Sequence, residues 1–343
     1  MKVCMFKKII FFTATLCVAC STDESIIEDY QGIEALVSIP DNFPDFVDDV
    51  NNPLTEEGVL LGEKLFFDKR LSGTNKVACA TCHLPERSFS DGVALSTNGV
   101  SAKKLLRNSP ALINLAWANN GLFWDGGSKN LESQAFAPLA HQDEMFQDLE
   151  ELVQELNDDK NYTTLFYEAF NEPINQTNIV KAIAQYERTL IFSNSKYDKY
   201  IRNEGEVVFT HQELKGLNLA TQHCFSCHVP PLFTDHQYHN NGIDDDFNDN
   251  SHDGMFQGRY RVSFDEKDIG AYRTPTLRNI DLTAPYMHDG RFTTLKEVVN
   301  HYSSNIKNSS SLANELLLTN SGFKFTNEEK EALISFLKTL TNQ

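Results

Sequence analysis

The sequence has little positive charge and no basic block. Its 343 residues include 30 Lys and Arg against 48 Asp and Glu, which gives a formal net charge of −18 at pH 7. So acidic a chain is not expected to bind nucleic acid, because a phosphate-binding surface needs clustered positive charge. Beyond the first twenty residues it also lacks any apolar run long enough to span a bilayer. Hydrophobic residues make up 41% and charged residues 23%, so the chain is expected to fold. Its length fits one large domain or two of about 150 residues each, and we favour two.

The first nineteen residues resemble a secretory signal peptide. Three lysines stand within the first eight residues, an apolar run follows over 9–19, and Cys20 comes next. This run is typical of an exported protein and too short to cross a membrane. The pair Ala19-Cys20 resembles a bacterial lipoprotein cleavage site, which predicts a lipid on Cys20, a tether over 20–45 and a periplasmic or outer-membrane location in a Gram-negative bacterium. Only the lipid anchor would then contact the membrane. Cleavage nearby would instead give a free periplasmic protein.

Cysteine is scarce, with seven in the chain, and four of the seven form two short motifs of the same pattern. These motifs are Cys79-Ala-Thr-Cys82-His83 and Cys224-Phe-Ser-Cys227-His228. The pattern is the covalent attachment signature of c-type haem: two thiols about one helical turn apart bond the porphyrin vinyl groups, and the adjacent histidine becomes an axial iron ligand. Zinc is the alternative, but zinc ribbons separate their cysteine pairs by only about 15–20 residues. The sequence therefore predicts two covalent c-type haems.

Helical patterns dominate the rest of the sequence, and alternating strand patterns are scarce. Apolar residues recur at helical spacing over 149–156 and 333–340, and Thr-x-x-Glu capping boxes mark helix starts. The predicted fold class is mostly α, with two cytochrome c-like haem domains and long loops. We place the N-terminal haem domain at 46–200 and the C-terminal haem domain at 201–343. Each attachment motif is expected to open its own helical module.

Further short motifs surround the two attachment motifs. In chain order they are Leu61-Gly62, Leu65-Phe66-Phe67-Asp68, Leu71-Ser72, Arg107-Asn108-Ser109-Pro110, Phe123-Trp124-Asp125-Gly126, Arg273-Thr274-Pro275-Thr276-Leu277-Arg278-Asn279 and Pro285-Tyr286-Met287-His288-Asp289-Gly290. In this order they resemble the bacterial dihaem cytochrome c peroxidase family, which includes the MauG enzymes. The similarity extends from about residue 40 to the C-terminus.

The resemblance implies a division of labour between the two haems. The haem on His83 would meet hydrogen peroxide, and the haem on His228 would take electrons from a donor and pass them on. Trp124 would lie between the haems and offer an electron path. Glu144 would be the acid–base group at the peroxide, with Gln134 as a hydrogen-bond partner.

The family pattern also implies a calcium ion between the haems. Asn114 and the backbone carbonyls of Thr283 and Pro285 match its ligands, and hard oxygen donors of this kind suit calcium. From the residues alone, the same positions would be an asparagine at a helix start and a turn.

Two positions depart from the usual peroxidase pattern. Between His83 and Trp124 the chain has no histidine and no methionine. Nothing in that loop can close the peroxide site, so the first haem is predicted to be open to peroxide without prior reduction. The second departure concerns the methionine that usually ligates the second haem, because this methionine aligns with Tyr302.

Tyrosine is a known haem ligand, and Tyr302 is our preferred ligand of the second haem. It also continues an apolar helical stripe, so core packing is an alternative. Met287 is the fallback ligand, and His301 and Met255 are weaker candidates.

Three functions compete. The first is a peroxidase that reduces hydrogen peroxide to water with electrons from a small cytochrome c or cupredoxin-type donor protein. The second is a MauG-like enzyme that oxidises a residue of a partner protein. The third is a non-enzymatic dihaem electron carrier, which has no use for an open iron site beside Glu144 and Gln134. A Tyr302 phenolate would stabilise ferric iron and favour the second function, whereas the breadth of the family favours the first, which we name as the prediction.

Overall fold

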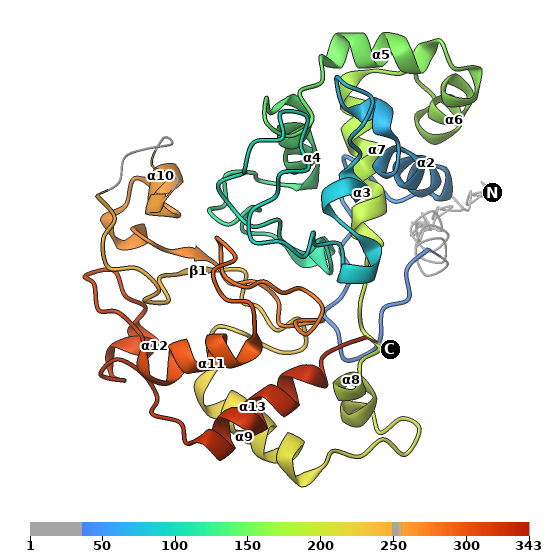
Figure 1. Cartoon of the computed structure of the whole chain (residues 1–343). Coiled ribbons are helices and arrows are strands. Elements are labelled where there is room, and N and C mark those ends of the chain that lie inside the picture. The colour runs from blue at the N-terminus through green and yellow to red at the C-terminus, as the bar shows by residue number, and fades with distance from the viewer. Residues whose placement is uncertain (1–35, 249–253, 255, 343) are drawn as a thin grey trace, which may run out of the picture.

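The computed structural model describes residues 36–248, 254 and 256–342, and this part of the chain is mostly helical. The α-helices are α2 (Glu56–Phe66), α3 (Cys79–Cys82), α4 (Leu131–Ala140), α5 (Leu149–Asn157), α6 (Lys160–Phe170), α7 (Gln176–Arg188), α8 (Lys196–Ile201), α9 (His211–His223), α10 (Tyr260–Ser263), α11 (Leu295–Ser304), α12 (Asn314–Leu317) and α13 (Asn327–Lys338). Short 3-10 turns cover Lys69–Leu71, Pro85–Arg87, Leu115–Trp117 and Glu266–Asp268. The mostly-α prediction is confirmed. Figure 1 shows the helices up to α7 in its upper half and α8, α9, α11, α12 and α13 in its lower half.

The upper group is built on the crossing of α2 and α7. Gly62 allows the close approach, because a Cβ at this position would collide with the backbone carbonyl of Ala182 on α7. Leu61 and Leu65 of α2 and Ile183 of α7 are buried in the shared core. α4 packs on α7 and α6 packs on α2, so the first core is closed by helices on several sides.

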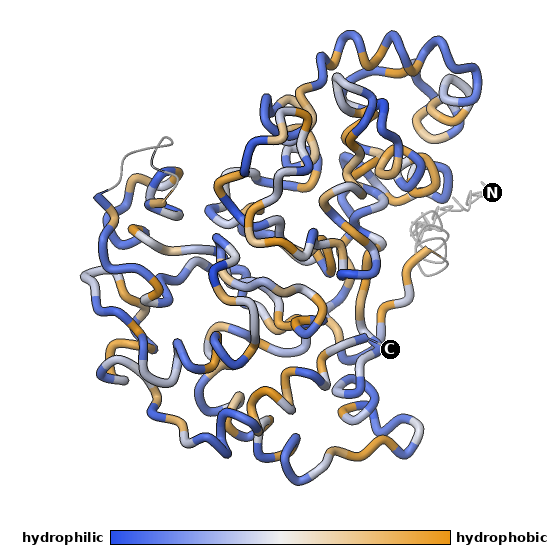
Figure 2. Tube along the Cα trace, in the orientation of Figure 1, coloured by the Kyte–Doolittle hydropathy of each residue, from blue (hydrophilic) through white to orange (hydrophobic). Residues whose placement is uncertain are grey.

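The lower group repeats this arrangement with α9 and α13. Gly216 of α9 faces the backbone carbonyl of Ala332 on α13 so closely that a Cβ would collide with it. Phe336 and Leu340, with Phe233 from a loop, fill a second core that is separate from the first. In Figure 2 apolar and polar positions alternate along these helices, as expected for elements with one buried face.

Long loops occupy much of the space between the helix groups. The strands β1 (Tyr238–His239) and β2 (Tyr272–Arg273) form a two-stranded antiparallel sheet, in which Tyr238 pairs with Arg273 and His239 pairs with Tyr272. This sheet joins two loop segments that both reach the functional site described below.

The local signals in the sequence correspond to real helix starts. Thr210, Thr294 and Thr326 each accept a hydrogen bond from the backbone N–H three residues on, and the glutamate there bonds back to the threonine N–H. The expectation that each attachment motif opens a helical module is wrong. Cys224 caps the C-terminal end of α9, and α3 is a single turn that comes after α2.

The described end of the predicted tether, residues 36–45, packs against the body of the protein. Val37 and Phe43 are buried, and the Phe43 ring lies 5.5 Å from the Trp117 ring. The indole N–H of Trp117 donates to the carbonyls of Pro44 and Asp45 at 3.2 Å. Two apolar side chains and two backbone acceptors therefore hold this stretch.

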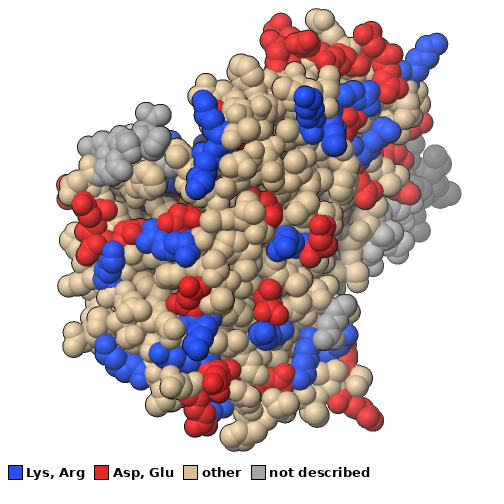
Figure 3. Space-filling view, viewed as in Figure 1, with Lys and Arg blue, Asp and Glu red and all other residues tan. Residues whose placement is uncertain are grey.

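The signal peptide, the lipid-bearing Cys20 and the candidate ligand Met255 lie outside the described residues. No described helix is both long and apolar enough to cross a membrane. The space-filling view shows acidic side chains gathered over α5 (Figure 3), where Asp148, Glu150 and Glu151 are exposed.

Candidate functional site

The first attachment motif forms one helical turn whose histidine is held by the backbone. α3 carries Cys79 and Cys82, and His83 is its C-cap residue. Nδ1 of His83 lies 2.7 Å from the carbonyl oxygen of Phe89. Because a carbonyl can only accept, Nδ1 carries the proton and Nε2 keeps a free lone pair. Burial lowers the pKa of His83 and raises the pKa of both thiols, so the ring is neutral, as a metal ligand must be.

The second motif has the same arrangement with different backbone acceptors. Nδ1 of His228 lies 3.2 Å from the carbonyl of Phe233 and 3.1 Å from that of Pro275. Burial lowers the pKa of His228 as well. Cys224 and Cys227 are free thiols in a half-buried position. Each motif thus presents two thiols and one imidazole Nε2.

The residues of both motifs fit covalent haem better than zinc. All four cysteines are free, so neither motif forms a disulfide. Among the described His, Cys, Asp and Glu side chains, the single group close enough to share a metal ion is Cys227, Asp235 and His239. It does not bring together the two cysteines of either motif, as a zinc site would need to do.

A mostly apolar cavity, here called the C-terminal cavity, opens in front of the second motif. Cys224, Cys227 and His228 lie in its lining, and so do Tyr302, Met287 and Asn241. Burial raises the pKa of Tyr302 to about 12, and the hydrogen bond with Asn241 opposes this. Tyr302 thus lines the same cavity as the second motif.

A buried guanidinium in the same lining lacks a counter-ion. Arg273 is 9% exposed, and no carboxylate of the described chain lies within ion-pair distance of it. Its one side-chain hydrogen bond joins Nη1 to Nδ1 of His236 at 3.4 Å, and Nε2 of His236 has no partner among the described residues. Burying an unpaired charge is costly, so this position fits a group that brings its own anion, such as a haem with its propionates.

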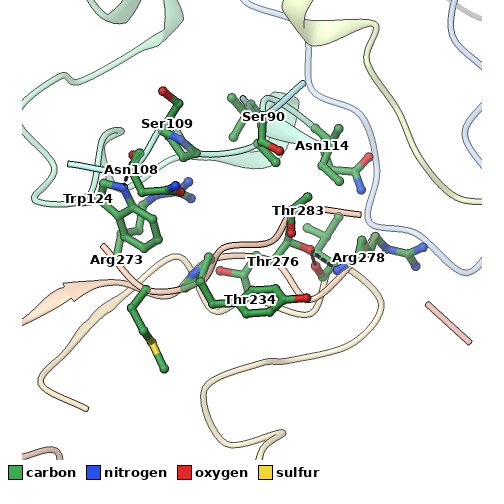
Figure 4. Close-up of a pocket in the computed structure, with 18 of the residues that line it drawn as sticks. Ser90, Asn108, Ser109, Asn114, Trp124, Thr234, Arg273, Thr276, Arg278 and Thr283 are labelled. Atoms are coloured by element: carbon green, nitrogen blue, oxygen red, sulfur yellow. Dashed lines mark hydrogen bonds between the residues drawn. The ribbon is translucent and has the colours of Figure 1, made fainter. Parts of the chain in front are cut away.

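Trp124 lies where two cavities meet. Its side chain lines the C-terminal cavity and also a second one, the central cavity, which extends to Asn114 and Thr283. Its indole N–H donates to the carbonyl of Asn108 at 2.8 Å, which fixes the plane of the ring (Figure 4). The backbone carbonyl of Trp124 accepts from the N–H of Arg273 at 2.8 Å, so the tryptophan is tied to both halves of the chain.

The three positions predicted to bind calcium line the central cavity together. Figure 4 shows Asn114 and Thr283 on opposite walls, and Pro285 belongs to the same lining. The amide of Asn114 is already engaged: Oδ1 accepts from the N–H of Phe192 at 2.8 Å, and Nδ2 donates to its carbonyl at 3.1 Å. An amide oxygen has two lone pairs, so one remains for a cation.

Gln134 and Glu144 lie on and just after α4. Gln134 is 7% exposed, and its Oε1 has no hydrogen-bond partner among the described residues. Glu144 is more accessible, with 37% of its side chain exposed, and Oε1 lies 3.4 Å from Nδ1 of His141. Burial raises the pKa of Glu144, the charge of His141 lowers it, and the charge of Asp143 raises it further. Burial is the main cause of the raised pKa of Cys82, and the charges of Asp91 and Glu144 add to it.

A family model described as di-haem cytochrome c peroxidase matches residues 56–206. The methylamine utilization protein MauG of Methylophilus methylotrophus is 34% identical over 306 residues, covering 88% of this chain and 86% of the relative. The chain belongs to the dihaem cytochrome c peroxidase and MauG family. Cytochrome-c peroxidase IdrP1 of Pseudomonas sp. (strain SCT) is 34% identical over 321 residues, covering 85% of this chain and 82% of the relative. As a member of this family the protein is a peroxidase-type oxidoreductase that carries c-type haem.

The solved structures agree with this family. A MauG-like protein associated with microbial copper homeostasis superposes with a TM-score of 0.80 at 32% identity, covering 89% of this chain and 95% of the other. The diheme peroxidase BthA from Burkholderia thailandensis E264 has the same fold, with a TM-score of 0.69 at 23% identity over 87% of each chain.

Sequence reasoning missed several residues of this dihaem site. One of them is His141, which the structure pairs with Glu144. Arg273 belongs to a motif that carries the family resemblance but has no role assigned from it, and Asn241 and His236 gave no signal, because their contacts join segments far apart in the chain. Nothing short of the fold could have identified them.

Proposed function

We propose that the protein reduces hydrogen peroxide to water, with electrons from a small cytochrome c or cupredoxin-type donor protein. Its first haem would be open to peroxide without prior reduction. The observation that supports this most is the combination of Glu144, just after α4, whose pKa is raised by burial, and Gln134 on α4, whose buried amide oxygen has no partner among the described residues. Such groups suit the handling of a small polar substrate.

The chain's own residues would hold the haems and manage protons. Cys79, Cys82 and His83 would hold the first haem, and the corresponding residues from 224 to 228 would hold the second. When bound, the haems would supply cleavage of the peroxide bond and storage of electrons. Glu144 would take a proton from one peroxide oxygen and return it to the other, and the exposed part of its side chain gives that proton a path to solvent.

The fixed position of Trp124 suits electron transfer between the two halves. An aromatic ring at the junction of both cavities, with its N–H engaged by a backbone carbonyl, cannot rotate freely. Two separate hydrophobic cores support a division into two haem domains, and the boundary between them would lie before Tyr197 rather than after residue 200, because Tyr197 and Tyr200 pack in the second core.

A second function has a specific observation in its favour. Tyr302 faces the C-terminal cavity, and as an iron ligand its phenolate would stabilise ferric iron and lower the potential of the second haem. Ordinary donors would then reduce that haem poorly. The protein would then oxidise a residue of a partner protein, as a MauG-like enzyme.

Two further expectations belong to the proposal. Calcium would be held by Oδ1 of Asn114 and the carbonyls of Thr283 and Pro285, together with water. The protein would be exported and attached to a Gram-negative membrane through a lipid on Cys20. Elemental analysis for calcium and mass spectrometry of the N-terminus test these two sites separately.

The experiment for the main proposal compares Glu144→Gln with Glu151→Gln, which changes an exposed carboxylate on α5. The haem-loaded, full-length proteins are mixed with hydrogen peroxide and an artificial one-electron dye, and kcat/KM for peroxide is measured. We expect E144Q to lose roughly 10²- to 10⁴-fold, and E151Q to match the wild type. Equal activity in both variants would contradict the role of Glu144.

A further inference from the structure

Asn241 lies two residues after the end of β1 and faces both candidate ligands of the second haem. Its amide Nδ2 is 3.5 Å from Oη of Tyr302 and 3.6 Å from Sδ of Met287. All three side chains line the C-terminal cavity together with His228. The proposed function leaves this amide without a role.

The rest of Asn241 is held by contacts that leave Nδ2 one direction to face. Oδ1 accepts a hydrogen bond from the backbone N–H of Ile243 at 3.2 Å. The backbone carbonyl accepts from Nε2 of His301 at 3.0 Å, which ties the loop to α11. An amide oxygen that accepts from a backbone N–H identifies the other end of the amide as the donor. The N–H donor is therefore the end that faces Tyr302 and Met287.

The two acceptors differ greatly in strength. A thioether sulfur is a weak acceptor, whereas a phenolate oxygen is charged and accepts a strong, charge-assisted hydrogen bond. An N–H group placed between them therefore stabilises the ligating form of Tyr302 far more than it stabilises Met287.

We propose that Asn241 is a positioning residue that holds the Tyr302 oxygen as a ligand of the second haem and raises the reduction potential of that haem. This rests on the proposed ligation by Tyr302. A hydrogen bond to the ligand oxygen withdraws negative charge from it, so the phenolate stabilises ferric iron less. The hydrogen bond from Asn241 thus raises the reduction potential of the second haem towards the range in which a donor protein can reduce it. This bears directly on the choice between the two proposed functions.

The test is a potentiometric titration of the full-length, haem-loaded protein, followed by absorbance. In Asn241→Leu the shape is nearly kept and the donor is lost. We expect the midpoint of the second haem to fall by an amount equal to roughly a tenfold change in the ferric-to-ferrous ratio, about 59 mV for one electron. Asn241→Asp replaces the donor with a carboxylate and should lower the midpoint further. An unchanged or raised midpoint in either variant would overturn the proposal.

Two control variants separate the role of Asn241 from the proposed ligation of the second haem by Tyr302. Tyr302→Phe should change the ferric spectrum of the second haem; if it does not, Tyr302 is not the ligand and the proposed ligation has failed. Met287→Leu should leave the midpoint near that of the wild type. If M287L reproduces the fall seen in N241L, then Asn241 acts on Met287 and the present proposal is wrong.

Discussion

Replacing Asp198 should destabilise the protein strongly, because it would leave a buried guanidinium without its counter-ion. Arg278 is 1% exposed and Asp198 is not exposed at all, and two parallel hydrogen bonds of 2.8 Å join them. Hydrogen bonds to charged groups contribute about 1.5–3 kcal/mol each, and removing one partner of a buried pair costs about 3–5 kcal/mol. The one remaining hydrogen bond of the Arg278 side chain would run from Nε to the carbonyl of Pro231, at 2.7 Å. We therefore expect Asp198→Asn to lose about 3–5 kcal/mol of the free energy of unfolding.

The assay is denaturant unfolding of the haem-loaded protein, followed by circular dichroism. Glu328→Gln is the matched control, since it removes a carboxylate from a surface pair with Lys215 in which Glu328 is 76% exposed. We expect no measurable loss in E328Q, because surface pairs contribute little. If D198N and E328Q unfold at the same denaturant concentration as the wild type, the reasoning about buried charge is wrong.

The pH dependence of this pair has a definite sign. Burial alone would raise the pKa of Asp198, but the hydrogen bonds and charge of Arg278 outweigh burial and lower it below 3.8. A carboxyl group with a lowered pKa contributes stability above its ordinary pKa and loses that contribution as the pH falls through the lowered value. The difference between wild type and D198N should therefore shrink in strong acid.

Two further predictions concern buried groups near the first motif and between the cavities. Burial, with help from Glu132, raises the pKa of Glu187 to about 8; its stabilising contribution is full below about 4.5 and is lost as the pH rises through about 8. Glu187→Gln should therefore have a higher free energy of unfolding than the wild type at pH 9, by up to about 5 kcal/mol, and equal stability at pH 6 and 9 in both proteins would contradict this. Trp124→Phe should slow peroxide-driven oxidation of the second haem in stopped-flow absorbance while leaving the ferric spectra unchanged, and an unchanged rate would remove Trp124 from the electron path.

Local patterns in the sequence predicted the features that depend on local structure. The haem motifs, the capping boxes and the apolar spacing of α5 all involve residues within a few positions of each other, so chain geometry alone specifies them. Glu144 and Gln134 came only from the resemblance, because a carboxylate and an amide ten residues apart have no distinctive spacing.

The features that sequence reasoning missed depend on distant contacts. The loop at Asn241 is placed by His301, sixty residues further on. Phe43, within the predicted tether, is buried against Trp117 and under the Arg278 guanidinium at 4.6 Å. Neither contact leaves a periodic signal in the sequence. Because of the second, residues 36–45 are packed against the protein although the sequence predicted a tether there.

Low-temperature EPR of the as-isolated ferric protein, before and after one equivalent of hydrogen peroxide without reductant, tests the open first haem most directly. No histidine or methionine lies between His83 and Trp124 to close that site. The account predicts a high-spin ferric signal that peroxide abolishes. Two low-spin ferric haems that do not respond to peroxide would contradict it, because an unrecognised ligand would then close the first haem.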